Sequence, residues 1–504
     1  MNALRAGAAS VDLRAPVGVD LVGFLRRHQA NEGNNQALEA GVLVLDDGHS
    51  RAVIVSIDTG SIVRPFADHM RERIAEAAGA GADAVFINAS HTHAAPPLPG
   101  HIKTGGSTAE PTPAEMHYAR AVLEGVEAAA AQAARGLVPV RLGHRRTSFD
   151  GGVNRRQRTD DGGTIMGWNP DGFRDTSLDV VRIETDSGTT LATLISYGCH
   201  PVVLGPDLNL ACADFVAPMR REVRASTGGE CLFLQGCAGN VFPLEGLFAE
   251  PGPEITFGKQ MARRALGVFD DAQPWEVTHR GTVMQSASPM ALWRSELVPG
   301  AGQAIAVAQR DVELKLQVLP TLAEAGEVRR GLEERLADLQ ARKRPRTEWN
   351  SVWLHLEWAT RVEQSLTDGT ATDRVLAPIG ALTVGPLTVV TLPCEPFAEI
   401  GAEIKRRVSG DLIVLGYTNH MVGYVPTREE FAWGGYEPWL APRHFGQPAP
   451  FDPGTADLLI QEAVAAAQQT QADAAARCGD AHPRSPSPGQ VRSDDLTGRP
   501  TAWS

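Results

Sequence analysis

The chain has 504 residues, of which 43% are apolar and 21% charged, and its formal net charge is −13. A chain of this length can bury a large apolar core without staples, and at about 100–200 residues per domain it has room for several domains or one elaborated domain. The acidic balance argues against a nucleic-acid-binding protein, which needs a basic face, and against electrostatic binding to anionic membranes.

Neither a membrane span nor a secretion signal is visible in the sequence. No window approaches about 18 uninterrupted apolar residues, the length that crosses a bilayer as a helix. The N-terminal segment has no apolar stretch of the kind a signal peptide requires, so we expect a cytoplasmic protein. No CxxC pair occurs among the cysteines, which predicts reduced thiols rather than a disulfide framework or a thiolate zinc site. The cysteines are Cys199, Cys212, Cys231, Cys237, Cys394 and Cys478.

The first half of the chain alternates apolar strand-like runs with helical stretches. Apolar residues at helical spacing predict a helix over 65–80, and an alanine-rich segment predicts another over 112–134. This alternation is typical of an α/β fold, and we expect a mixed β-sheet core with flanking helices. The expected strands are 40–46, 51–58, 83–89, 138–143, 180–184, 190–196 and 231–235.

Composition changes near residue 310. Residues 310–344 and 349–366 are rich in Glu, Arg, Leu and Ala, and their apolar spacing predicts a long inserted helical hairpin. We expect this hairpin to be a packing arm, or the contact of a homo-oligomer. Strands return at 375–380, 382–384, 387–392 and 411–416, and helices are expected over 396–408 and 455–476.

These shifts suggest one discontinuous catalytic domain. Its first part is residues 1–300, the hairpin insertion is 301–370 and the remainder is 371–476. Residues 477–504 are rich in Pro, Ser, Gly and charged residues, which predicts a disordered and dispensable tail.

Polar residues follow several of the expected strands, where α/β scaffolds usually carry their sites. His91 and His93 follow the strand that ends at 89, and His200 precedes Pro201 after the strand that ends at 196. A neutral imidazole is a good zinc ligand. Asp214 is a candidate acceptor that orients such an imidazole. Taken alone, the HxH motif is explained more simply by local hydrogen bonding, and His200 by a buried core histidine.

Three further clusters follow strands later in the chain. Residues 233–243 form a glycine-containing turn, Glu395 lies between two prolines, and residues 416–437 are aromatic and rich in turns. Taken singly, they are also explained as a tight turn, as an acid favoured at a helix N-terminus and as packing tyrosines.

The order of the five clusters along the chain is more specific than any one of them. In chain order they read HTH, GCHP, QGCAGN, LPCEPF and GYVPTREEF followed by GGYE. This series resembles the neutral ceramidase family, zinc-dependent amidases that cut the amide of N-acylsphingosine, and the resemblance runs over about residues 5–459. It implies a zinc ion held by His91, His200, Glu395 and Tyr424.

The resemblance also implies residues that act on the substrate. Tyr436, before a glutamate, would hold the scissile carbonyl. Arg155 would contact the reacting group, although the serine of the family's Asn-Arg-Ser motif is replaced here. Cys394 stands where the family usually has glycine, and Asn240 stands where it has an acid. We also expect no C-terminal β-domain of the kind that the long ceramidases carry, so the resemblance indicates the reaction better than it indicates the substrate.

The expected reaction is therefore hydrolysis of an N-acyl amide by a metal-activated water. His93 is the candidate for proton transfer or substrate orientation, and Tyr436 and Arg155 would stabilise the oxyanion. Asp58 is a candidate support residue, and residues 97–108 are expected at the mouth of the pocket. We expect a smaller, soluble N-acyl substrate rather than ceramide. Alternatives are an esterase, lactonase or carbamate hydrolase, or a non-catalytic binding protein.

Overall fold

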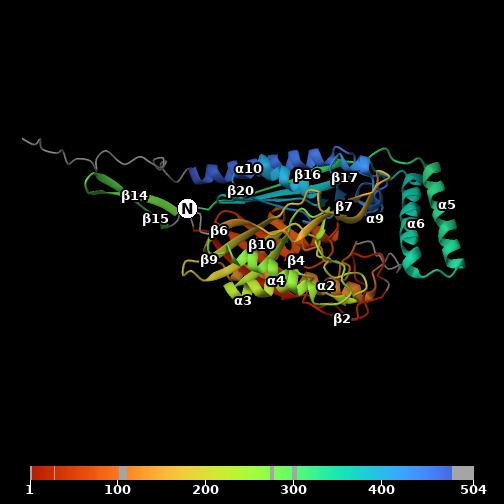
Figure 1. Cartoon of the computed structure of the whole chain (residues 1–504), viewed down its shortest axis with the longest axis horizontal. Coiled ribbons are helices and arrows are strands. Elements are labelled where there is room, and N and C mark those ends of the chain that lie inside the picture. Colours follow the sequence, from red (N-terminus) through yellow and green to blue (C-terminus); the bar gives the residue numbers. More distant parts are fainter. Residues whose placement is uncertain (1–2, 28, 101–110, 273–276, 298–302, 480–504) are drawn as a thin grey trace, which may run out of the picture.

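The computed structural model describes residues 3–27, 29–100, 111–272, 277–297 and 303–479. Its main elements form four layers in the order helix, sheet, sheet, helix (Figure 1). The α/β fold with mixed sheets is confirmed, and the core consists of two packed sheets.

The larger sheet has eight strands in the order β12-β10-β9-β6-β1-β3-β4-β5. The pairs β4–β5 and β10–β12 are parallel, and the other neighbours are antiparallel. The strands are β1 (Arg5–Asp12), β3 (Glu39–Asp46), β4 (Arg51–Ile57), β5 (Val85–Ala89), β6 (Val138–Ser148), β9 (Ser177–Thr185), β10 (Thr190–Tyr197) and β12 (Glu230–Gln235).

The smaller sheet stacks face to face on the larger one. Leu43 and Leu194 of the larger sheet share one buried cluster with Leu382 and Ile413 of the smaller sheet. Since each sheet is covered on both faces, its strands read as nearly continuous apolar runs. The smaller sheet is β16 (Ile305–Lys315), β17 (Arg374–Val384), β18 (Leu387–Thr391) and β20 (Asp411–Leu415), with β18 and β20 parallel.

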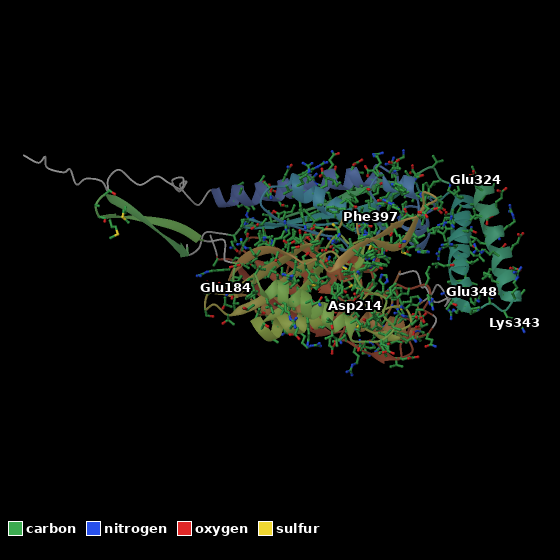
Figure 2. All side chains as sticks on the ribbon, viewed as in Figure 1. Glu184, Asp214, Glu324, Lys343, Glu348 and Phe397 are labelled. Carbon is green, nitrogen blue, oxygen red and sulfur yellow. The ribbon has the colours of Figure 1, made fainter. Side chains whose placement is uncertain are left out.

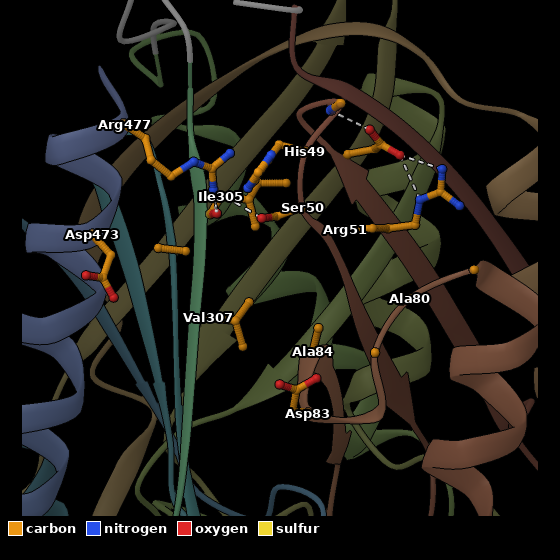
Figure 3. Close-up of a pocket in the computed structure, with 15 residues that line it drawn as sticks. His49, Ser50, Arg51, Ala80, Asp83, Ala84, Ile305, Val307, Asp473 and Arg477 are labelled. Atoms are coloured by element: carbon orange, nitrogen blue, oxygen red, sulfur yellow. Dashed lines mark hydrogen bonds and ion pairs between the residues drawn. The ribbon is translucent and has the colours of Figure 1, made fainter. Parts of the chain in front are cut away.

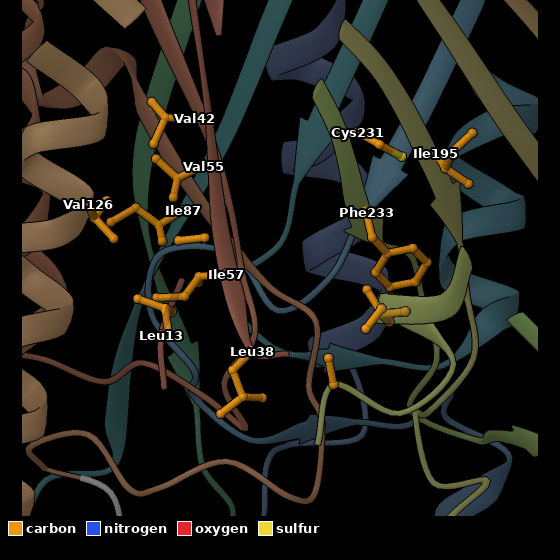
Figure 4. Packing of buried hydrophobic residues seen from close by; sticks show 14 of the residues in the cluster. Leu13, Leu38, Val42, Val55, Ile57, Ile87, Val126, Ile195, Cys231 and Phe233 are labelled. Carbon is orange, nitrogen blue, oxygen red and sulfur yellow. The ribbon is translucent and has the colours of Figure 1, made fainter. Parts of the chain in front are cut away.

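Helices cover the two outer faces of the sandwich. Val42, Val55 and Ile87 of the larger sheet pack in one cluster with Val126 of α2 (Figure 4). On the other side, helices α7 and α10 cover the smaller sheet. These helices are α1 (Phe66–Ala78), α2 (Pro113–Arg135), α3 (Val216–Thr227), α4 (Pro253–Leu266), α7 (Ala398–Arg407) and α10 (Thr455–Gly479).

The helical hairpin consists of α5 (Leu322–Ala341) and α6 (Arg346–Thr367) and stands at one end of the molecule (Figure 1). Its charged side chains, such as Glu324 and Glu348, lie on that end (Figure 2). The prediction that the helix begins at 310 is wrong, because residues 305–315 form strand β16. Val312 and Leu314 are two positions apart and both buried, which is the period of a strand rather than of a helix.

The remaining elements are β2 (Gly33–Asn34), η1 (Ala82–Ala84), β7 (Gly152–Arg158), β8 (Thr164–Asn169), β11 (Leu210–Ala211), β13 (Val241–Pro243), β14 (Val277–Gln285), β15 (Pro289–Leu297), β19 (Glu395–Pro396), β21 (Tyr424–Val425), α8 (Glu430–Trp433), η2 (Tyr436–Leu440) and α9 (Ala441–His444).

Among the described helices, none has the length and apolar character needed to span a membrane. Five of the cysteines are buried free thiols. Residues 101–108 of the expected pocket mouth and 480–504 of the expected tail lie outside the described residues.

Candidate active site

Two buried amide side chains bring the strand ends of the site together. Asn88 on β5 donates to Gly416 O at 2.8 Å, and its Oδ1 accepts from the backbone N–H of Gln235 at 2.7 Å. Gln235 in turn donates through Nε2 to Ser90 O and Cys199 O, at 3.0 and 2.8 Å. These bonds join the ends of β5, β10, β12 and β20, and His91 and His200 follow β5 and β10.

Glu395 and Tyr424 are brought together by backbone pairing. The two-residue strands β19 and β21 run parallel, and Glu395 lies opposite Tyr424 in their register. Both side chains are buried. Glu395 and Tyr424, which belong to two separate sequence motifs, are therefore neighbours in the structure.

The tautomers of two histidines are set by backbone carbonyls. His91 Nδ1 lies 2.5 Å from Gly60 O, and His200 Nδ1 lies 2.8 Å from Ala238 O. A carbonyl oxygen only accepts, so each Nδ1 carries the proton and each Nε2 presents a lone pair. His91 has a positive φ of 66°, which is uncommon for a residue with a side chain.

The lone pairs of these two histidines converge on one carboxylate. Glu395 Oε2 is 3.2 Å from His91 Nε2 and 3.4 Å from His200 Nε2. It has no hydrogen-bonding partner within the described part of the chain. We call His91 Nε2, His200 Nε2 and Glu395 Oε2 the acceptor trio. Acceptors that face each other in a buried site repel, and a bound cation removes that repulsion.

The protonation states agree with a cation site. Burial, together with the charge of Arg155, lowers the pKa of His200 to about 3, so its imidazole is neutral. Burial alone would raise the pKa of Glu395, but His91 and His200 beside it hold that pKa well below its usual range. Neutral imidazoles and an ionised carboxylate are the forms that bind metals.

His93 belongs to the same cluster. Its Nε2 lies 3.2 Å from His91 Nε2, and His91, His93 and His200 form a group that could hold a metal ion. Burial, then the two neighbouring histidines, lowers the pKa of His93 well below its usual value. The sequence analysis gave His93 only a catalytic role, whereas its position also allows it to be a ligand.

Arg155 supplies a buried positive charge beside the trio. Its Nη1 is 3.2 Å from His200 Nε2, and its Nε donates to Glu437 Oε1 at 2.8 Å. Burial alone would lower the pKa of Arg155, but Tyr424 and Glu437 raise it, so the guanidinium stays charged. Its Nη2 is buried and has no partner among the described residues. That nitrogen remains as a donor for a ligand.

Glu437 holds Arg155 in place and was missed by the sequence analysis. Its second oxygen accepts from Arg156 Nη1, and Arg156 also pairs with Glu430 at 2.6 Å. Arg155, Arg156 and Glu437 are each at most 1% exposed. The signal was present in the sequence, since Glu437 directly follows Tyr436 in the GGYE motif.

Tyr436 lies next to the cluster without bonding to it. Its ring meets that of Tyr424 edge to face, with centroids 5.6 Å apart, and its hydroxyl lies 2.9 Å from His444 Nδ1. Tyr424 OH is 3.4 Å from His200 Nε2. Burial raises the pKa of both tyrosines, so both are protonated phenols.

Asp214 and Asp58, which were predicted to support the site, have their partners outside the acceptor trio. Asp214 does not orient His200, whose Nδ1 faces a carbonyl. Instead it accepts the backbone N–H groups of Val203 and Leu204 and so braces the loop after His200. Burial raises the pKa of Asp214 to about 7. Asp58 forms a buried ion pair with Arg220.

Asn240 has a structural role in the glycine turn. Its Oδ1 accepts from the backbone N–H of Ala398, and its Nδ2 donates to Glu399 Oε2 at 2.8 Å. Its backbone carbonyl accepts from the N–H of Arg155. The asparagine therefore ties the turn that faces His200 to the start of α7.

A separate polar pocket of about 700 Å³ lies between α10, β16 and the β3–β4 turn (Figure 3). None of the predicted site residues lines it. Arg477 is bonded to Asp47, and Arg51 is paired with Asp46, so these charges are satisfied within the protein. We assign no ligand to this pocket.

Comparison with known proteins identifies the fold. No family model and no curated protein matches the sequence. Among solved structures, neutral ceramidase from Pseudomonas aeruginosa is similar, with a TM-score of 0.63, 17% identity, and coverage of 93% of this chain and 75% of that one. The chain has a neutral-ceramidase-like fold. A ceramidase complexed with C2 gives the same TM-score at 16% identity, covering 94% of this chain and 76% of its own.

Proposed function

We propose that the protein is a zinc-dependent hydrolase that cleaves the amide bond of an N-acyl compound. The acceptor trio carries this proposal, because two buried imidazole nitrogens lie 3.2 and 3.4 Å from the same buried carboxylate oxygen, and a cation between them removes the repulsion of these acceptors. The ceramidase-like fold supports the choice of an amide as the bond that is cut.

The donor set fits zinc. His91, His200 and Glu395 offer two nitrogens and one carboxylate, which is the ligand pattern of catalytic rather than structural zinc sites. Tyr424 is proposed as the fourth ligand, and His93 is within reach of the same position. Zinc bound there would polarise a carbonyl and lower the pKa of water to about 7.

The remaining residues act on the substrate directly. Arg155 donates a hydrogen bond to the carbonyl oxygen, as negative charge develops, from its Nη2, which has no partner among the described residues, and Tyr436 donates a hydrogen bond to the same atom from its hydroxyl. One such donor contributes about 3–4 kcal/mol to transition-state stabilisation. His93 takes the proton of the attacking water and passes it to the leaving nitrogen, a role that the position of its Nε2 in the same cluster supports.

The surface around Tyr436 favours an apolar acyl group. Trp439 and Leu440, in the same element, are 42% and 41% exposed. On β8, which contacts η2, Ile165 and Met166 are 52% and 50% exposed. These side chains offer an apolar surface on η2 and on the strand that contacts it.

The test is a substrate panel with and without chelator. Short-chain N-acyl amides, long-chain ceramide in detergent, matched esters and lactones are assayed while bound metal is measured by elemental analysis. We expect about one zinc per chain, chelator-sensitive amide hydrolysis, and faster turnover of the soluble amides than of ceramide.

The matched control compares two histidines. His200→Ala should lose metal and activity, whereas His69→Ala, at an exposed position on α1, should keep both. Active protein without a transition metal would refute the proposed cofactor. Hydrolysis of esters or lactones but not of amides would replace the proposed reaction.

A further inference from the structure

A short chain of side chains leads from the candidate active site to the helical hairpin. Tyr436 OH lies 2.9 Å from Nδ1 of His444, the last residue of α9. The ring of His444 stacks on that of His355 in α6, with centroids 5.4 Å apart and planes 17° apart. A residue outside every sequence motif therefore holds the phenol that we assign to the substrate carbonyl.

The direction of the Tyr436–His444 hydrogen bond decides what the phenol can do. If His444 Nδ1 accepts, the single phenol proton is used inside the protein and cannot reach a carbonyl oxygen. If Nδ1–H donates to the phenol oxygen, the phenol proton stays available for the substrate. Both possibilities concern a neutral ring, because burial, with His355 and Arg443 nearby, lowers the pKa of His444 to about 3.

The surroundings of the second ring nitrogen favour one tautomer. His444 Nε2 is buried and has no hydrogen-bonding partner among the described residues. A proton placed there would be an orphaned buried N–H, which is rarer in proteins than an acceptor left without a donor. The proton of the neutral ring is therefore on Nδ1, the nitrogen that faces Tyr436.

Building on the proposed function, we infer that His444 is a positioning residue that donates its Nδ1–H to the Tyr436 oxygen and leaves the phenol proton for the substrate carbonyl. A phenol that accepts a hydrogen bond is also a stronger donor, because hydrogen bonds in a chain polarise one another. His444 thus acts through Tyr436 and does not touch the reacting atoms.

The hairpin keeps this arrangement in place. Trp358 of α6 donates to Gln447 O at 2.7 Å, and Gln447 Nε2 donates to Val422 O at 2.6 Å. Arg443, next to His444, lies over the Trp358 ring at 4.8 Å. Helix α6 is therefore packed against α9 and the residues that follow it, and His355 covers the ring of His444.

The test is a double-mutant cycle on purified, zinc-loaded protein with the best amide of the panel. His444→Phe keeps the ring and its stacking but removes both nitrogens. It should lower kcat by about ten-fold, the effect of one neutral hydrogen bond, with little change in KM. In a Tyr436→Phe background, the same change should have no further effect on kcat.

Two variants make the cycle specific. His444→Asn places an amide donor near the Nδ1 position and should restore most of the lost kcat. His117→Phe, at an exposed site on α2, should leave kcat unchanged. Equal losses from His444→Phe with and without the Tyr436 hydroxyl would overturn the inference, because His444 would then not act through Tyr436.

A substrate-free measurement separates this inference from the proposed function. Two-bond proton–nitrogen correlation spectra of histidine-labelled wild-type protein report which ring nitrogen carries the proton, and either variant at 444 identifies the signal. We expect the proton on Nδ1, and a proton on Nε2 would refute the inference. If the wild type hydrolyses no compound of the panel, the proposed function fails, and the tautomer alone decides the role of His444.

Discussion

The two halves of the candidate site are built in different ways. The acceptor trio is fixed by the main chain, since carbonyls of Gly60 and Ala238 orient the imidazoles of His91 and His200. The donors are fixed by other side chains. Arg155 depends on Glu437, and Tyr436 on His444.

This difference implies that the two halves should fail differently on mutation. Main-chain carbonyls cannot be removed by substitution, so the orientation of the two imidazoles is less open to change by mutation than that of the donors. The donors can be weakened from a distance, through residues that never meet the substrate. The first three predictions below test one half against the other.

The largest effect should come from the trio itself. His200→Ala removes one acceptor, and we expect loss of bound zinc together with a fall in kcat/KM of about 10³-fold or more. Elemental analysis and steady-state kinetics on the same preparation check this. Full zinc content in the variant would mean that His200 is not a ligand.

Loss of Glu437 should damage the donor half and the fold at once. Glu437→Gln leaves the buried guanidiniums of Arg155 and Arg156 without a shared counter-charge, which typically costs about 3–5 kcal/mol of stability. Chemical denaturation checks this, with the exposed Glu429→Gln as control. Zinc content of the folded fraction should stay unchanged. If the metal leaves with Glu437, the two halves are not separable.

Substitution of the two tyrosines should also separate the two halves of the site. Tyr424→Phe should weaken zinc binding, and added zinc should partly restore activity. Tyr436→Phe should retain zinc and lose about 10²–10³-fold in kcat, as for loss of one oxyanion donor. The two variants are compared for metal content and kinetics in parallel. The reverse pattern would show that their assignments are exchanged.

The smallest expected effect concerns the turn behind the trio. Burial raises the pKa of Glu399, which accepts from Asn240, to about 7. Between pH 4.5 and 7 the folded state therefore holds a proton that the unfolded chain has lost, so this group makes stability fall as pH rises. Glu399→Gln should gain up to about 3 kcal/mol over the wild type across that range and then level off. Denaturation at several pH values measures the difference, and a constant difference would exclude this origin.

Sequence patterns were sufficient where a residue follows a regular strand. His91, His200 and Glu395 each come after an apolar run, and such runs end at a common edge of the fold. The structure brings all three together, as well as Arg155 and Tyr424. The roles assigned to them remain predictions.

Patterns were insufficient where a role depends on contacts between distant segments. Strand β16 was predicted as helix because its pairing with β17 is not visible locally. Asp214 and Asp58 also follow or flank strands, yet their partners are backbone amides and Arg220. Glu437 had a signal beside Tyr436, but its pairing with two arginines could not be read from spacing.

The hydrogen bonds made by the side-chain amides of Asn88 and Gln235 have a consequence for the order in which the protein can assemble. Asn88 donates a hydrogen bond to Gly416, 328 positions further along the chain. Glu395 is also synthesised long after Asn88. During synthesis, the two histidines leave the ribosome long before their carboxylate partner. A nascent chain that ends before Glu395 has no complete trio, so the cation of the proposed function would bind only after the second sheet has docked. Because such long-range closure is slow, His91 and His200 would be without their carboxylate partner until then.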